Sequence, residues 1–353
     1  MIISRTPYRI SFFGGGTDYP DWYLKNGGEV LSASIDKYCY LSCRYLPPFF
    51  PHRIRIMYSK NELCQDIDEI QHPSVRGLLK YLQADVDGLE IFHQGDLPAR
   101  SGIGSSSSFT VGLLNAMYAL KGKMIGKEQL AKECIHIEQD VIKETVGSQD
   151  QISAAYGGVN HIKFFSSGSF SVNPIVVDLD RIAELNQHLM LFFTGVVRTA
   201  DKIAKSYAVE IEKKRKHLSL MGKMVGEAIA IMNNAGTIDD FGKLLHEACT
   251  EKKELSQIVS NSYVNEIYSV ARETGALGGK LCGAGGGGFM LLFVPPEKQP
   301  AIKEKLSKLV YVPFNFEYGG SQIMYSDKQK RYLEEENVRN NKSITSHLDL
   351  TNL

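Results

Sequence analysis

The sequence has no excess of charge of either sign: 40 lysine and arginine residues are matched by 40 aspartate and glutamate residues. This balance gives no reason to expect a nucleic-acid partner or a polybasic membrane surface, so anion binding must come from a local site. Hydrophobic residues make up 43% and charged residues 23%, which argues against a disordered, collagen-like or coiled-coil protein. A length of 353 residues fits roughly two domains.

The sequence also has little that would support disulfides or a membrane span. Its six cysteines form no CxxC motif and no Cys/His cluster; they are Cys39, Cys43, Cys64, Cys134, Cys249 and Cys282. The start, MIISRTPYRISFF, has no sustained apolar region with a cleavage site, and apolar runs such as Phe289–Val294 are too short to cross a bilayer. We therefore expect a soluble, unexported protein of the reducing cytoplasm.

Strand-like runs alternate with helical patterns in the first half of the chain, as in an α+β domain. The expected strands are Tyr8–Phe13, Glu29–Leu46, Arg53–Tyr58 and Leu89–His93, with helices near 74–83, 109–121 and 127–144. The second half predicts a strand at Leu189–Thr194, helices at 200–217, 218–233, 238–256 and 262–273, a strand–loop–strand at Gly278–Val294, a helix after Pro295-Pro296 and a strand at Val310–Glu317. The predicted fold is α+β, with domains at 1–190 and 191–330 and a polar tail at 331–353.

The first glycine segment, Phe13–Pro20, directly follows a predicted strand. Its three consecutive glycines let the backbone approach a ligand closely. Thr17 and Asp18 add short polar groups suited to bonding sugar hydroxyls. A simple hairpin turn is the alternative interpretation.

The serine segment, Leu97–Ser108, leads into a strongly apolar helical pattern. Backbone amides and hydroxyls at the start of a buried helix form an anion cradle with the helix dipole, and a serine there can bind magnesium. The segment therefore predicts a phosphate site. It lacks the Gly-Lys-Ser/Thr ending of a Walker A loop and does not match GxGxxG.

The last glycine segment, Gly278–Phe289, has seven glycines within eleven residues. Glycine at this density is costly in a strand. It indicates a backbone shaped around a ligand or around another segment of the chain.

Two carboxylates stand out between these segments. Helical spacing places Glu138 on the apolar stripe of Leu130, Cys134 and Val141, where a metal ion, a cation or an internal salt bridge must balance it. Gly147–Gln151 predicts a helix start, with Ser148 as N-cap and Gln151 at the capping-box position. Asp150 then lies in the first turn, where it either orients a hydroxyl proton or only stabilises its helix.

Together these segments resemble the three motifs of the GHMP small-molecule kinases, named for their galactose, homoserine, mevalonate and phosphomevalonate members. The matching stretches are Pro7–Tyr19, Pro98–Ser108 and Lys280–Phe289, in the family's order, and the resemblance spans about residues 1–325. It implies an N-terminal domain like domain 2 of ribosomal protein S5, a ferredoxin-like C-terminal domain, and an active site between them.

The resemblance also implies roles for individual residues. The second motif wraps the ATP phosphates, the acid on a following helix completes a Mg²⁺ site, the aspartate of Gly-x-x-Asp-Gln acts on the acceptor hydroxyl, and a first-motif cation balances the phosphoryl group. The implied residues are Asp150 and Arg9 (catalytic); Ser106 and Glu138 (metal); Pro98, Ser101, Gly102, Ile103, Gly104, Ser105, Ser106 and Ser107 (ATP); and Gly15, Gly16, Thr17, Asp18, Arg198, Gly283, Ala284 and Gly285 (substrate).

The first motif narrows the substrate that the resemblance implies. Galactokinases carry Gly-Glu-His before the sugar-binding acid, whereas Gly14–Asp18 here is the form of the heptose 7-phosphate kinases and their fucokinase-like relatives; Asp66–Pro73 and Thr194–Ala200 also look like the heptose branch. This implies ATP- and Mg²⁺-dependent phosphorylation of the anomeric C1 hydroxyl of D-glycero-D-manno-heptose 7-phosphate. The 1,7-bisphosphate would serve the biosynthesis of nucleotide-activated heptose.

Several alternatives stay open at this point. Arg198, expected at the start of a helix just beyond a strand, is the candidate for the sugar's own phosphate, with a surface salt bridge as the alternative. The expected partner is the small-molecule sugar phosphate, without nucleic acid or membrane, and a homodimer is left open. A fucokinase- or galactokinase-like kinase and a non-catalytic sugar sensor also fit, whereas a nicotinamide-dependent oxidoreductase would need a GxGxxG unit that is absent.

Overall fold

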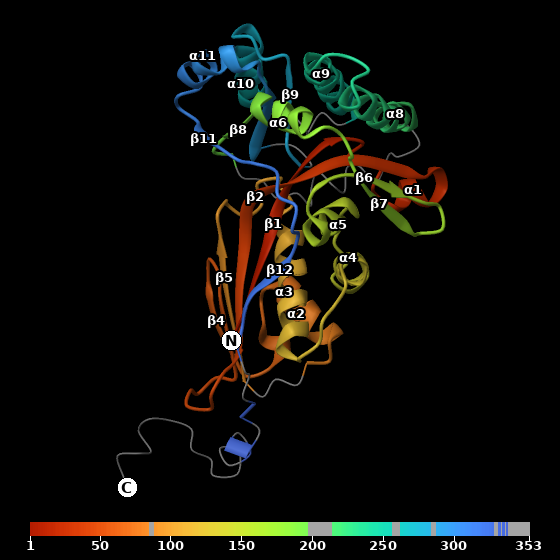
Figure 1. Ribbon diagram of the computed structural model, residues 1–353. Helices are drawn as coiled ribbons and strands as arrows, with labels where there is room; N and C mark the ends of the chain where they lie inside the picture. Colours follow the sequence, from red (N-terminus) through yellow and green to blue (C-terminus); the bar gives the residue numbers. More distant parts are fainter. Residues whose placement is uncertain are drawn as a thin grey trace.

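The computed structural model describes residues 1–84, 88–196, 214–255, 262–283 and 287–327, together with Arg331, Tyr332, Glu334, Glu335 and Asn337. Two lobes are stacked in Figure 1: a lower lobe built on a long sheet, and an upper lobe of helices around a smaller sheet. The mixed architecture confirms the expected α+β fold class. Among the described residues, no helix is long and apolar enough to cross a membrane.

The lower sheet has eight strands within the described residues, in the order β12-β1-β2-β5-β3-β4, with β6 and then β7 attached to the first half of β2. Its strands are β1 (Ile2–Phe13), β2 (Gly28–Tyr45), β3 (Ile54–Met57), β4 (Asn61–Cys64), β5 (Leu89–Gly95), β6 (Val159–Phe164), β7 (Phe170–Pro174) and β12 (Gln322–Ser326). β1 and β2 pair antiparallel along most of their length. Their apolar side chains, such as Ile10, Phe12 and Val30, are buried, so the strand pair forms part of the hydrophobic core.

Helices of the lower lobe lie beside the long strands in Figure 1. They are α1 (Pro20–Asn26), α2 (Pro73–Tyr81), α3 (Ser105–Leu120), α4 (Lys127–His136) and α5 (Gln149–Tyr156). Most residues of α3 are buried, and a side chain at its Gly112 would meet the Thr6 hydroxyl at 2.8 Å. The Ser4 hydroxyl donates to the Gly112 carbonyl at 2.9 Å, so α3 is held directly against β1.

The upper lobe contains a four-stranded sheet in the order β11-β8-β10-β9 within the described residues. Its elements are α6 (Leu179–His188), β8 (Leu189–Phe193), α8 (Arg215–Met232), α9 (Ile238–Leu255), α10 (Ser262–Glu273), β9 (Gly278–Leu281), β10 (Phe289–Phe293), α11 (Gln299–Lys305) and β11 (Val310–Val312). An aromatic cluster joins the lobes, because the Phe241 ring of α9 packs edge-on at 5.5 Å from Phe12 and 5.1 Å from Phe13.

Two element boundaries predicted from the sequence are wrong. The boundary expected between residues 217 and 218 does not exist, since α8 continues through it with Leu218, Met221 and Val225 on one buried stripe; residues 200–213 of the first expected helix lie outside the described part. The strand expected to reach Glu317 ends at Val312, because Pro313 has no N–H to continue the ladder.

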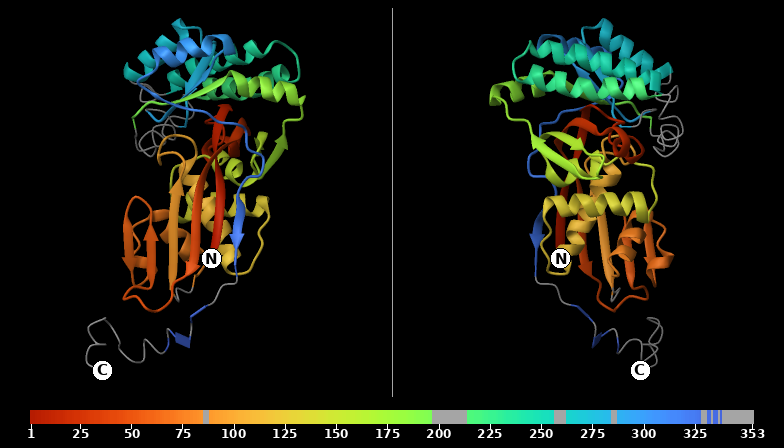
Figure 2. Two further views of the ribbon diagram at one scale, coloured as in Figure 1. Left: turned by 60° about the vertical axis from the view of Figure 1, so that its left-hand side comes forward. Right: turned by 90° about the vertical axis from the view of Figure 1, so that its right-hand side faces the viewer.

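The C-terminal part of the chain returns to the lower lobe, which the division at residues 191–330 did not anticipate. The strand β12 pairs antiparallel with β1, and the two views of Figure 2 show the preceding segment descending from the upper lobe to the long sheet. Backbone bonds from Glu317 to Ser34 and from Gly158 to Glu317 fasten this segment at 2.9 and 2.6 Å. The strand β12 is therefore part of the lower sheet, while the expected polar tail falls mostly outside the described residues.

Candidate active site

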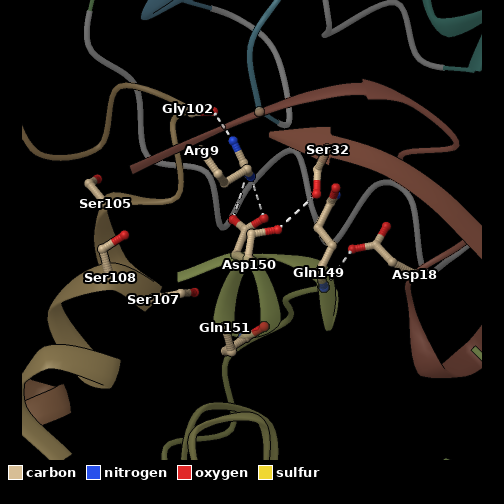
Figure 3. Close-up of polar contacts among 12 residues, drawn as sticks. Arg9, Asp18, Ser32, Gly102, Ser105, Ser107, Ser108, Gln149, Asp150 and Gln151 are labelled. Atoms are coloured by element: carbon tan, nitrogen blue, oxygen red, sulfur yellow. Dashed lines mark hydrogen bonds and ion pairs between the residues drawn. The ribbon is translucent and has the colours of Figure 1, made fainter. Parts of the chain in front are cut away.

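Arg9 of β1 and Asp150 of α5 form a two-point ion pair where the lobes meet (Figure 3). Arg9 Nε donates to Asp150 Oδ1 at 2.7 Å and Nη2 donates to Oδ2 at 2.6 Å, while Nη1 donates to the Gly102 carbonyl at 2.8 Å. The Arg9 side chain is 5% exposed and the Asp150 side chain 24% exposed. The guanidinium is therefore buried behind a carboxylate that remains accessible to a ligand.

The serine segment brings the start of α3 against this ion pair. The Arg9 amide donates to the Ile103 carbonyl at 3.0 Å. Gly104 has a left-handed backbone with φ of +74°, and a side chain there would lie 3.1 Å from Arg9 Cγ and 3.6 Å from Asp150 Cγ. Because the first backbone N–H groups of a helix have no acceptor within the helix, α3 presents an anion-binding end beside Asp150.

Glu138 lies in a π-helical turn, Ile137–Val141, that continues α4. The wider turn buries Ile137 and Glu138 and leaves Val141 37% exposed, so the apolar stripe expected through Val141 is wrong. Glu138 Oε2 accepts from the Ser107 hydroxyl at 2.8 Å and from Gln151 Nε2 at 2.5 Å. Burial raises the pKa of Glu138 to about 7, and its Oε1 has no hydrogen-bond partner among the described residues.

The serines of this segment have different surroundings. Ser107 contacts Glu138, whereas the Ser106 side chain, expected to share a metal ion with Glu138, is exposed. The hydroxyls of Ser101 and Ser108 donate to the carbonyls of Pro98 and Pro7 at 2.6 and 2.8 Å. Ser105 Oγ accepts from the Arg100 amide at 3.0 Å, so three of the hydroxyls hold the loop in shape.

The capping box expected at the start of α5 is absent. Ser148 makes no side-chain cap, and its hydroxyl accepts from Gln139 Nε2 at 3.1 Å. Gln151 instead extends to Glu138, because α5 packs against α3 and α4 and turns that face inward. Gln151 therefore links the helix that carries Asp150 to the second carboxylate.

Thr17 and Asp18 support the first glycine segment rather than facing a ligand. The Thr17 hydroxyl is 2% exposed and donates to the Gly14 and Glu29 carbonyls at 2.8 Å. Asp18 is 1% exposed, and its Oδ1 accepts from the Gly16 amide at 2.9 Å. Burial raises the pKa of Asp18, while its backbone carbonyl accepts from the Ser148 amide at 2.9 Å. Thr17 therefore fastens its own loop to β2, and Asp18 joins this loop to the start of α5, so both side chains are already occupied by contacts within the protein.

Unpaired polar atoms converge near Gly15, and the sequence reasoning missed them. A side chain at Gly15 would lie 3.5 Å from Ser11 Oγ and 3.8 Å from Gln149 Nε2. Ser11 Oγ and Gln149 Oε1 are buried without a hydrogen-bond partner among the described residues, whereas Gly15 and Gly16 are partly exposed. Figure 3 shows Gln149 between Asp18 and Asp150. The sequence contained a signal for Gln149, because this polar residue directly precedes Asp150, the catalytic candidate.

The last glycine segment packs backbone to backbone on the serine segment. A Cβ at Gly283 would lie 2.5 Å from the Gly102 Cα, and one at Gly288 would lie 2.1 Å from the Ser101 carbonyl oxygen. The Phe289 amide donates to that same carbonyl at 3.2 Å. At Gly283, a glycine is therefore required because the serine segment packs directly against it. The predicted site residues Ala284, Gly285 and Arg198 lie outside the described residues.

Comparisons with known proteins agree with this geometry. The description "GHMP kinases N terminal domain" matches residues 73–158, and "GHMP kinases C terminal" matches residues 227–312. The D-glycero-alpha-D-manno-heptose 7-phosphate kinase of Campylobacter jejuni is 30% identical over 320 residues, covering 87% of this chain and 93% of the relative. The chain belongs to the GHMP kinase family. As a member of that family it is a phosphotransferase with an alcohol group as acceptor.

Other GHMP kinases are similar over most of the chain. The bifunctional fucokinase/GDP-fucose pyrophosphorylase of Arabidopsis thaliana is 28% identical over 332 residues, covering 86% of this chain and 31% of that longer protein. The solved structure of a D-glycero-D-manno-heptose 1-phosphate kinase from Bacteroides thetaiotaomicron superposes with a TM-score of 0.75, covering 93% of this chain and all (100%) of that one. At 23% identity, the structural match shows the shared GHMP fold alone.

Proposed function

We propose that this GHMP kinase transfers the γ-phosphoryl group of ATP to the anomeric C1 hydroxyl of D-glycero-D-manno-heptose 7-phosphate, giving the 1,7-bisphosphate. The observation that carries the proposal is the accessible Asp150 carboxylate, held by Arg9 beside the N-terminus of α3. The similarity to the heptose 7-phosphate kinase of Campylobacter jejuni supports this acceptor.

Asp150 is the group that orients the acceptor hydroxyl and takes its proton. Each carboxylate oxygen accepts one bond from Arg9 and keeps a further lone pair for the hydroxyl. Because the Arg9 guanidinium touches both Asp150 and the Gly102 carbonyl, it fixes the carboxylate relative to the phosphate-binding loop. In-line phosphoryl transfer depends mainly on such positioning and on charge stabilisation.

The residues at Glu138 fit a magnesium ion. Oxygen ligands are those that Mg²⁺ prefers, and Glu138 Oε1 is buried without a hydrogen-bond partner among the described residues. The described residues contain no group of three or more His, Cys, Asp or Glu side chains that could hold a metal, so phosphate oxygens must complete the coordination. Glu138 would hold the ion with Ser106, while Ser107 orients the carboxylate. When bound, Mg²⁺ neutralises charge on the phosphate oxygens.

The acceptor sugar lies over Gly15 and Gly16 in this proposal. Both glycines are partly exposed, and the unpaired Ser11 Oγ and Gln149 Oε1 supply polar atoms for sugar hydroxyls. Buried polar groups left without partners cost free energy, so a hydroxyl bound there is favoured. Asp150 follows Gln149 directly and faces the same space (Figure 3).

A kinase of another sugar is the second candidate. The Arabidopsis thaliana fucokinase and the galactokinase of Thermococcus kodakarensis are 28% and 25% identical over 86% of this chain. A fucokinase-like activity would use the same Asp150 and Arg9 with a different set of hydroxyls at Gly15.

A panel of sugars and sugar phosphates tests the proposal. ADP release is measured with the purified chain, ATP and MgCl₂, and the product of each active acceptor is identified by ³¹P NMR. We expect the highest kcat/KM with heptose 7-phosphate and a new anomeric phosphate resonance coupled to H1. An inert heptose 7-phosphate beside an active neutral hexose would establish the second candidate, and ATP binding without turnover of any sugar would indicate a sensor.

A further inference from the structure

One buried and one partly buried lysine, which the reaction as proposed so far does not use, lie in the upper lobe close to the site. Lys280 of β9 is 4% exposed, and its Nζ donates to the Phe12 carbonyl of β1 at 2.8 Å. Lys252 of α9 is partly buried, and its Nζ donates to the Gly283 carbonyl. Each ammonium has three donors, so each can bind further acceptors.

Both ammonium groups lie at the junction of the three motifs. The Phe12 carbonyl is on β1, three residues beyond Arg9. The Gly283 carbonyl belongs to the residue that packs directly on Gly102, whose own carbonyl accepts from Arg9. Lys252 is therefore connected to Arg9 through the contact between Gly283 and Gly102.

No carboxylate is bonded to these two lysines within the described residues, although the buried Asp18 is close enough to favour the charged form of Lys252. Within the described residues, no ion pair joins Lys252 or Lys280 to an acid, while Asp150 is paired with Arg9. Burial lowers the pKa of Lys280 to about 7, and burial lowers the pKa of Lys252 as well. An uncompensated buried charge is costly, so an anionic ligand that approaches both groups gains their full attraction.

A small cavity next to both lysines limits where such an anion can sit. Lys252, Lys253 and Lys280 line it together with Tyr268, and no acidic side chain is among its lining residues. Its volume of about 20 Å³ has room for a water molecule but not for a phosphate group. A phosphate group bound by both ammonium groups would therefore lie outside this cavity.

We propose that Lys252 and Lys280 bind the phosphate group that the acceptor sugar already carries. The inference rests on the proposed function, since a neutral acceptor would leave the two ammonium groups without an anion. A phosphate group of ATP has the same anionic oxygens as the phosphate of the sugar, but the backbone amides at the start of α3 already provide a binding site for the nucleotide. The described lysines thus take the role that the sequence assigned to Arg198.

Comparing acceptor sugars with and without a phosphate group distinguishes binding of the sugar's phosphate from binding of a phosphate of ATP. The substitutions K252Q and K280Q are compared with K243Q, which removes the same charge from the exposed Asp240–Lys243 pair on α9. For each variant, kcat/KM is measured with heptose 7-phosphate and with the same heptose lacking phosphate, and KM is measured for ATP. Thermal unfolding confirms that each variant is folded, and K252R restores a cation in place of the first substitution.

The expected result is a loss of about 10- to 100-fold in kcat/KM for the phosphorylated sugar with K252Q and K280Q, because charge-assisted bonds to phosphate are lost. The unphosphorylated heptose and the KM for ATP should change by less than about threefold, and K252R should recover most of the loss. K243Q should match the parent chain.

Three kinetic results would overturn the inference. Equal losses for both sugars would make the lysines structural, a raised KM for ATP would assign them to the nucleotide, and equal use of both sugars by the parent chain would leave no phosphate to recognise. Binding of heptose 7-phosphate is also measured calorimetrically without ATP in the parent chain and K252Q. If the parent chain shows no turnover but binds heptose 7-phosphate, and K252Q binds it more weakly, the result would support the lysine site and contradict the proposed kinase activity. If K252Q binds heptose 7-phosphate as tightly as the parent chain, the result would contradict the lysine inference alone.

Discussion

Glu138 and Asp150, twelve residues apart, meet opposite electrostatic surroundings. Asp150 is paired with the Arg9 guanidinium, whereas Glu138 Oε2 accepts hydrogen bonds from the neutral donors Ser107 and Gln151. Burial without a counter-charge raises the pKa of Glu138 to about 7. In the proposed mechanism these different surroundings suit different roles, with Asp150 acting on the hydroxyl proton and Glu138 holding the metal ion.

The substitution E138Q tests the metal role. Glutamine keeps the shape and a hydrogen-bond acceptor but removes the charge, so kcat should fall about 100-fold and the Mg²⁺ concentration for half-maximal rate should rise. Stability should not fall, since a buried charge is removed. The control is E128Q on α4, where the exposed Glu128 pairs with Lys132. Unchanged kcat and Mg²⁺ dependence in E138Q would exclude Glu138 from the metal site.

Lys280 predicts a pH dependence of stability in the substrate-free protein. Its pKa is lowered to about 7, below the value near 10.4 of an unfolded chain, so between these values the unfolded state binds more protons and stability rises with pH. Relative to K280M, the free energy of unfolding should increase by about 2 kcal/mol from pH 7 to pH 9 and stay constant below pH 6. Urea unfolding at each pH measures the difference, and a pH-independent difference would contradict the lowered pKa.

The site residues could be predicted from the sequence where a motif contains a side chain suited to the chemistry. The sequence placed Arg9, Asp150 and Glu138 in one site, and the structure brings Arg9 and Asp150 into contact. The hydrogen bond from Ser107 to Glu138 was not predicted, because the serine that faces this carboxylate depends on the rotation of α3 about its axis. The polar residue Thr17 was expected to face a ligand, yet its hydroxyl holds the backbone of its own loop.

At the scale of elements, the serine segment and the last glycine segment act as one unit. Gly102 has φ of +84°, and a side chain there would lie 2.4 Å from the Cys282 carbonyl oxygen. The Gly102 carbonyl also accepts from Arg9. The contact between the two loops therefore fixes the position of the ion pair.

The substitution G102A tests this contact. It should lower the free energy of unfolding by about 1–3 kcal/mol beyond the effect of G122A, because only Gly102 of this pair combines a left-handed backbone with a backbone clash. Gly122 is the matched control, with φ of +70° and no other atom within 4 Å of the place where a methyl group would lie. Denaturant unfolding and kcat are measured for both. Equal effects of the two substitutions would show that the loops do not constrain each other.

Some element boundaries were not predictable from local pattern. The π-helical turn at Ile137–Val141 shifts the helix register by the width of one residue, which a fixed helical period cannot detect. The short β12 strand, Gln322–Ser326, has an exposed burial pattern and no strong alternation, since it only covers the edge of β1. Its existence depends on a distant partner strand.

For the whole molecule, the two lobes contribute different residues to the proposed active site. The lower lobe supplies Arg9, Glu138 and Asp150, while the upper lobe supplies Lys252, Lys280 and the loop that packs on Gly102. The Phe12–Phe241 contact and the segment leading to β12 cross between the lobes, so the relative position of these groups is fixed by packing as well as by sequence. The order of the motifs was readable from the sequence, but this crossing was not.

Turnover and nucleotide binding by the substitution D150A, measured on one protein preparation, test the central claim most directly. ADP release with the best acceptor gives kcat, and calorimetric titration with ATP and MgCl₂ gives the nucleotide Kd. We predict a fall in kcat of at least about 1,000-fold with the Kd for ATP within about threefold of the parent chain, since Asp150 acts on the acceptor hydroxyl. Turnover close to that of the parent chain would contradict the account.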